Sequence, residues 1–207
     1  MTANFANLKD EIIQLDLAGA DIFHIDVMDG DYVPNFGLSP EIIQVIRKST
    51  NKLVDVHLMI NKPSRYINFF SELGIDIVYI HPDSETHPGR TLKNIKSKGM
   101  KAGIVINPDI SLDAVKELFP LVDYVMFMTV YPGFSGQKYE QEVEDKISKT
   151  LEFKTIYGFE IFIDGAVSPS VIKKMKYSGV DGFVLGTSAL FNQEENFENL
   201  IDKYKEM

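Results

Sequence analysis

Short apolar runs alternate along this chain with amphipathic segments. The run from Ile22 to Val27 is of strand length, and it follows a segment from Asn7 to Ala18 that carries apolar residues at helical spacing. Most of the short runs are apolar at nearly every position, which is typical of parallel strands that are buried on both faces. The pattern therefore predicts repeated strand–helix units.

Seven strands and eight helices follow from this pattern. The predicted strands are 22–27, 53–57, 76–80, 101–106, 123–128, 159–163 and 181–185, and the predicted helices are 7–18, 39–48, 63–73, 90–98, 111–119, 142–157, 168–178 and 197–205. Strand starts recur roughly every 22–36 residues, the spacing of β-α units in a barrel. We expect an α/β fold, a TIM (β/α)8-type barrel, that forms one catalytic domain over residues 1–207.

The beginning of the chain departs from this plan. The first predicted element is a helix, so the first β-strand of an eight-stranded barrel is missing or truncated. Either residues 1–4 are a remnant of that strand, or the barrel is open at this point.

Composition narrows the classes of function. The net charge of −9 argues against nucleic acid and anionic membrane surfaces as partners. The chain has no cysteine, which excludes thiol catalysis, thiolate metal sites and disulfides. No signal peptide and no apolar run of roughly 20 residues is visible, so we expect a cytoplasmic protein.

The candidate chemistry begins in the strand 22–27 and its continuation to Gly30. Because side chains alternate along a strand, His24, Asp26 and Met28 share one face. A second run, 55–59, again places an acid, a histidine and a methionine on one face: Asp55, His57 and Met59.

Four side chains near strand ends form a candidate metal centre: His24, Asp26, His57 and Asp164. Two imidazoles and two carboxylates suit one divalent ion, with Zn²⁺ favoured and Mn²⁺, Fe²⁺ or Co²⁺ as alternatives. The alternative is that these groups pair with one another inside the core. Asp55 is expected to orient a ligand imidazole. No organic cofactor is expected.

Two carboxylates from different strands also suit proton removal on one face of a carbon and proton delivery on the other. A divalent ion would stabilise the enediolate that forms between those steps. Met28, Met59 and Met128 lie at three strand ends, where they either cover the enediolate or pack in the core.

Glycine-bearing loops after the later strands predict an anion site. Backbone N–H groups in such loops approach phosphate closely, and barrels often bind phosphate after their last two strands. The candidate phosphate-binding residues are Gly133, Phe134, Ser135, Gly136, Gly165, Gly186 and Thr187.

Together these motifs resemble the ribulose-phosphate 3-epimerase family. The matching runs span nearly the whole chain: 24–30, 33–35, 55–59, 128–130, 132–134, 136–137 and 164–165. The resemblance implies that His24, Asp26, His57 and Asp164 bind the metal and that Asp26 and Asp164 are the acid/base pair. It also implies that the region of Gly136, Gly165, Gly186 and Thr187 holds the phosphate.

Within the family, details of the sequence look more like the D-allulose-6-phosphate 3-epimerase branch. They are residues 38–40, 81–83, 186–188, 190–192 and 195–196, and Ala166, where the ribulose enzymes usually carry glycine. We therefore expect D-allulose 6-phosphate and D-fructose 6-phosphate as substrates, with D-ribulose 5-phosphate and D-xylulose 5-phosphate as the alternative.

Two features depart from the family pattern. Tyr131 stands where a smaller polar residue is usual and is expected to narrow the site. The family also opens with a strand that carries a Pro-Ser segment, so we expect the natural reading frame to supply a short apolar strand with a serine upstream. The non-enzyme alternative is a truncated, inactive barrel that still binds metal or sugar phosphate.

A decarboxylase of the Asp-x-Lys-x-x-Asp type is disfavoured, since His24-x-Asp26 offers no lysine. The expected partner is a small-molecule ketose phosphate, and the expected assembly is a homo-oligomer, a dimer or larger.

Overall fold

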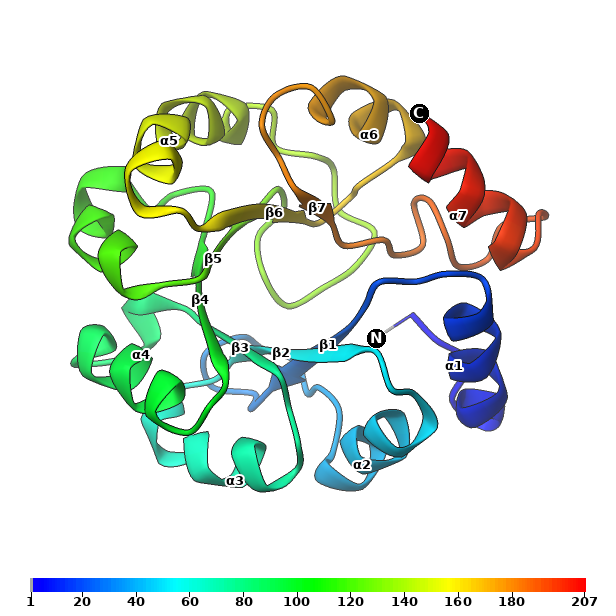
Figure 1. Ribbon diagram of the computed structural model, residues 1–207, viewed down its shortest axis with the longest axis horizontal. Coiled ribbons are helices and arrows are strands. Elements are labelled where there is room, and N and C mark those ends of the chain that lie inside the picture. Colours follow the sequence, from blue (N-terminus) through cyan, green and yellow to red (C-terminus); the bar gives the residue numbers. More distant parts are fainter. Residues whose placement is uncertain (1) are drawn as a thin grey trace.

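A parallel sheet of seven strands in chain order organises the protein. The computed structural model describes residues 2–207. The strands are β1 (Ile22–Met28), β2 (Leu53–Met59), β3 (Ile77–Ile80), β4 (Lys101–Ile106), β5 (Tyr124–Met128), β6 (Glu160–Asp164) and β7 (Gly182–Phe183). The sheet curves around a central space with the helices outside it, and it is open between β7 and β1 (Figure 1). This confirms the expected α/β barrel, and the described residues ahead of α1 form no strand.

The α-helices follow the strands around the outside of the sheet. They are α1 (Leu8–Leu17), α2 (Pro40–Ser49), α3 (Ile67–Glu72), α4 (Pro88–Ser97), α5 (Val143–Tyr157), α6 (Pro169–Met175) and α7 (Phe197–Glu206). None of the helices within residues 2–207 combines the length and the apolar character that crossing a membrane requires.

The alternation of side chains along β1 separates the core from the candidate site. Phe23 and Ile25 are buried in the layer between sheet and helices, where they join the main apolar cluster. His24 and Asp26 point the other way and line the central cavity. The strand therefore contributes to packing on one face and to chemistry on the other.

The free edge of β1 is covered over its carboxyl-terminal half. Gly37 N donates to Met28 O at 3.2 Å, and Leu38 N donates to Asp26 O at 3.2 Å. A Cβ on Gly37 would lie 2.4 Å from Met28 N, so only glycine fits this close approach. The segment around Gly37 thus satisfies backbone groups that an edge strand would otherwise expose.

The helices α1 and α7 contact each other on the outside of the barrel where the sheet is open. Thr2, Ala3 and Asn4 form no strand, and Met1 lies outside the described residues. In Figure 1, α7 lies beside α1 across this opening. Lys205 Nζ in α7 donates to Gly19 O at 2.6 Å, just beyond the end of α1.

The prediction of a single helix over 111–119 was wrong. This segment forms two short 3₁₀ helices, Leu112–Ala114 and Lys116–Leu121, and the Ser111 side chain makes no capping hydrogen bond. Val115 leaves the helical region with φ −124° and ψ −11°. Pro120 has no N–H to continue a helical ladder.

Two further elements are shorter than predicted. The helix expected over 63–73 is interrupted at Tyr66, whose φ of −113° separates a 3₁₀ turn from α3. The last strand keeps only Gly182 and Phe183, because the described residues provide no strand on its far side to extend the ladder.

Replacing Gly37 tests the coverage of the β1 edge. Gly37→Ala is expected to lower stability by about 1–3 kcal/mol, since the added methyl group meets strand backbone that cannot move aside. Thermal and urea unfolding measure the loss. Gly89→Ala in α4 is the matched control, because its nearest neighbour is the Leu121 side chain at 3.3 Å. Equal stability of the two variants would contradict this account of the edge.

Candidate metal centre

The register between β1 and β2 builds the site from two matching rows. His24 lies opposite Asp55, and Asp26 lies opposite His57. Parallel strands keep opposite residues on the same face of the sheet, so all of these side chains point into the barrel. The two similar runs of the sequence, 24–28 and 55–59, therefore form one continuous polar surface inside the barrel.

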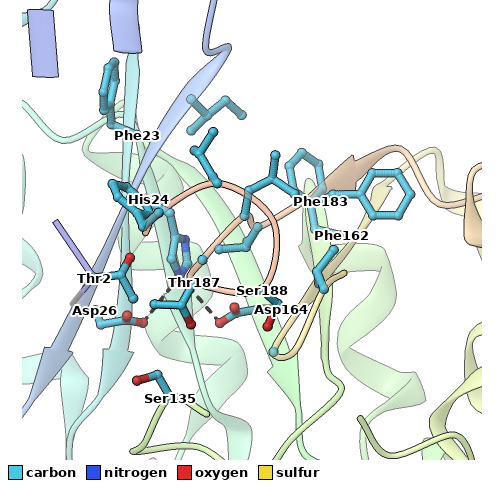
Figure 2. Close-up of a pocket in the computed structure, with 18 of the residues that line it drawn as sticks. Thr2, Phe23, His24, Asp26, Ser135, Phe162, Asp164, Phe183, Thr187 and Ser188 are labelled. Carbon is cyan, nitrogen blue, oxygen red and sulfur yellow. Dashed lines mark ion pairs between the residues drawn. The ribbon is translucent and has the colours of Figure 1, made fainter. Parts of the chain in front are cut away.

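Asp164 at the end of β6 faces these rows across the barrel. His24 Nε2 lies 3.5 Å from Asp26 Oδ1 and 3.7 Å from Asp164 Oδ2. His57 Nδ1 lies 3.4 Å from Asp26 Oδ1 and 3.7 Å from Asp164 Oδ2. Figure 2 shows the carboxylates of Asp26 and Asp164 on either side of the His24 ring, each joined to it by a dashed line. One donor atom from each of the four residues lies within 4.8 Å of the others.

These distances fit a shared cation better than direct hydrogen bonds. His24 Nε2 and His57 Nδ1 are buried and form no hydrogen bond in the described part of the chain. Two ligands about 2.1 Å from one ion at the tetrahedral angle are themselves about 3.4 Å apart. The separations of 3.4 and 3.5 Å between the ring nitrogens and Asp26 Oδ1 match this distance between two ligands of one ion. The donor set of nitrogens and carboxylate oxygens suits a divalent ion, and the choice of Zn²⁺ stays a prediction.

The electrostatics of the cluster favour charged forms. Burial alone would raise the pKa of Asp26, but the two imidazoles outweigh burial and hold this pKa well below its usual range. Burial would lower the pKa of His24, yet Asp55 and Asp26 raise it well above its ordinary value. The pKa of His57 is also raised against burial, by Asp164 and Asp26. Metal binding releases protons from such ligands, so a divalent cation can replace the protons that the imidazoles bind.

Each histidine has a partner on its side away from the cluster. His24 Nδ1 lies 2.6 Å from Asp55 Oδ1, so the imidazole that Asp55 contacts is that of His24. His57 Nε2 lies 2.7 Å from His81 Nε2. No chemical role for His81 was predicted from the sequence. Its position two residues after the inward-facing Tyr79 was the available signal.

A cavity of about 620 Å³ opens from the candidate centre. Met28, Met59 and Met128 all line it and are themselves buried. Tyr131 also lines the cavity with 48% of its surface exposed, so it lies toward the solvent. His57 is fully buried behind the wall.

The glycine loops lie around the same cavity. All of the candidate phosphate-binding residues line it: Gly133, Phe134, Ser135, Gly136, Gly165, Gly186 and Thr187. Figure 2 shows Ser135, Thr187 and Ser188 near the two aspartates. The structure thus brings the predicted anion loops and the acidic pair to one cavity, and their role in phosphate binding stays a prediction.

The turn after β6 has an unusual backbone. Gly165 has φ 111°, and a Cβ there would lie 2.5 Å from Val130 Cγ2. Ala166 follows with φ 50°, a left-handed conformation that favours glycine. The Ala166 methyl group therefore lines the cavity at the cost of some backbone strain.

The sequence is similar to proteins of one family along most of its length. The model of the ribulose-phosphate 3 epimerase family matches residues 1–191. The ribulose-phosphate 3-epimerase of Bacillus subtilis (strain 168) is 38% identical over 198 residues, which cover 94% of this chain and 91% of that protein. The protein of the same name from Escherichia coli (strain K12) is 35% identical, with 99% of this chain and 92% of the relative covered.

Similarity to solved structures supports the fold. A crystal structure of KGPDC from Streptococcus mutans superposes with a TM-score of 0.74 and 13% identity. The match covers 96% of this chain and 89% of that chain. At this identity the likeness concerns the barrel fold alone.

Removing one imidazole tests the metal centre. We expect about one divalent ion per chain in the purified protein, and we expect His24→Ala to weaken Zn²⁺ binding strongly because a nitrogen ligand is lost. Elemental analysis and competition with a chelator measure both effects. His87→Ala is the control, since His87 is exposed at the start of α4 and lies outside the cluster. Equal zinc affinity of the two variants would show that the cluster is not the metal site.

Proposed function

This chain belongs to the ribulose-phosphate 3-epimerase family, and we propose that it is a metal-dependent epimerase that inverts the third carbon of a ketose phosphate. The observation that carries this proposal is the cluster of His24, Asp26, His57 and Asp164 at the wall of the cavity. Two of its members are carboxylates from strands on different sides of the barrel. This is the arrangement that inversion at one carbon requires.

The two aspartates act as proton carriers on opposite sides of the substrate. For one direction of the reaction, Asp26 removes the proton from the third carbon, and the electron pair moves into the adjacent carbonyl group to give an enediolate. Asp164 then donates a proton to the other face of that carbon, and the roles reverse for the opposite direction.

A divalent ion held by the four residues would polarise the substrate oxygens next to the reacting carbon. The chain's own contribution is then to orient the substrate and to exclude water. Met28, Met59 and Met128 present thioethers to the cavity, and their apolar surface keeps water from the enediolate. Backbone N–H groups near Gly165, Gly186 and Thr187 are proposed to hold the phosphate.

We favour D-ribulose 5-phosphate and D-xylulose 5-phosphate as the substrate pair. The support is that relatives 35–41% identical to this chain carry the name ribulose-phosphate 3-epimerase. D-Allulose 6-phosphate and D-fructose 6-phosphate are the second candidate pair. Ala166 favours them, because its methyl group changes the wall of the cavity where the pentulose enzymes usually carry glycine.

Asp164→Asn tests the acid/base assignment. The amide keeps the size of the side chain but cannot carry the proton, so we expect kcat to fall by about 10²–10⁴-fold with little change in substrate affinity. Steady-state kinetics and a binding titration measure the two quantities. Asp202→Asn on the exposed face of α7 is the control. A loss below tenfold with metal still bound would remove Asp164 from the mechanism.

Comparison of two substrates tests specificity. We expect kcat/KM for D-ribulose 5-phosphate to exceed that for D-allulose 6-phosphate by at least roughly tenfold, a difference of about 1.4 kcal/mol in transition-state binding. The reverse order would assign the enzyme to the hexulose phosphate. Absence of turnover with both sugars in the metal-loaded protein would favour the inactive barrel.

A further inference from the structure

His81 contacts a candidate metal ligand but belongs to no part of the proposed proton transfer. It follows β3 directly, is fully buried, and has its Nε2 atom 2.7 Å from His57 Nε2. The two ring centroids are 4.9 Å apart, with 28° between the planes. His57 is therefore contacted by carboxylates at Nδ1 and by a second imidazole at Nε2.

The short distance between the two Nε2 atoms restricts where protons can lie. Two imidazole nitrogens form a hydrogen bond only if one carries a proton and the other offers a lone pair. A metal ligand needs a lone pair on the nitrogen that faces the ion, which for His57 is Nδ1. The proton of a neutral His57 then lies on Nε2 and is donated to His81 Nε2. His81 must in turn carry its own proton on Nδ1.

The surroundings of His81 hold its ring in place. The Tyr32 ring packs against His81, with the ring centroids 4.9 Å apart and 42° between the planes. The Tyr32 hydroxyl donates to Asp83 Oδ2 at 3.0 Å and accepts from Asn107 Nδ2 at 2.9 Å. Tyr32 is thus fixed from two other loops, and His81 lies between it and His57.

We propose that His81 is a positioning residue for the metal centre: it accepts the Nε2 proton of His57 and so directs the Nδ1 lone pair of His57 toward the ion. This inference rests on the metal site of the proposed function, but not on epimerase activity. It assigns His81 the part that Asp55 takes for His24, with a neutral acceptor in place of a carboxylate.

Zinc affinity of two His81 variants tests the proposal. His81→Leu removes the acceptor, and we expect its Zn²⁺ dissociation constant to rise about 10–100-fold, as is typical when a partner of a metal ligand is lost. His81→Gln offers an amide oxygen in place of the ring nitrogen and is expected to stay within about threefold of the parent, since the acceptor is restored. Competition with a chelator measures all three proteins.

A control separates positioning from general destabilisation. Leu92→Ala opens a cavity in the outer core, where Leu92 is fully buried in α4. This variant is expected to lower the melting temperature without changing Zn²⁺ affinity. If His81→Leu binds Zn²⁺ as tightly as the parent, or if His81→Gln is as weak as His81→Leu, the proposal is wrong.

Nitrogen-15 NMR of the histidine rings gives a readout that needs no variant. In the Zn²⁺-loaded parent we expect His81 to carry its proton on Nδ1 and to show Nε2 as a bare acceptor. A proton on His81 Nε2 would overturn the proposal even if the variants do not fold. The protein could show the expected ring signals and the expected order of Zn²⁺ affinities but no epimerase activity. That result would reject the proposed function and leave the role of His81 intact.

Discussion

The register between β1 and β2 is the constraint on which the rest of the site depends. It places His24 beside Asp55 and Asp26 beside His57 in two consecutive rows. Because side chains alternate with period two, a slip of one residue would turn one strand's polar groups into the apolar layer beneath the helices. Phe23 and Ile25 are buried in that layer, so the same burial that stabilises β1 also points His24 and Asp26 into the barrel.

The barrel keeps this register although its sheet is open. An edge strand normally exposes unpaired backbone groups, and β1 is such an edge within residues 2–207. The close approach of Gly37 covers the half of β1 that carries Asp26, next to the candidate metal centre. The contact between α1 and α7 closes the outer layer at the same place. The opening is thus bounded by contacts that keep the first strand in position.

Much of the fold and of the candidate site could be predicted because both depend on local periodicity. Apolar runs marked the strands, and alternation within 24–28 and 55–59 identified the inward faces. The prediction for the segment 111–119 was wrong because the spacing of apolar residues says nothing about the backbone angles of Val115 or the missing N–H of Pro120. The role of His81 was not predictable in this way, since its contact with His57 depends on the register between β2 and β3, which places Tyr79 opposite His57 and brings His81 near it from beyond the end of β3. The identities of the metal and of the sugar could not be predicted, because the same residue types bind several divalent ions and several sugar phosphates.

Proton exchange between two carboxylates and opposite faces of one carbon is central to the proposed mechanism. Its most direct test is the reaction of D-ribulose 5-phosphate with the metal-loaded protein in deuterium oxide, stopped at low conversion and analysed by NMR at the third carbon. We expect the product to carry solvent deuterium there, because the group that delivers the proton is not the group that removed it. Product that retains its original proton at the third carbon would contradict the mechanism, since a single group would then have carried that proton from one face to the other.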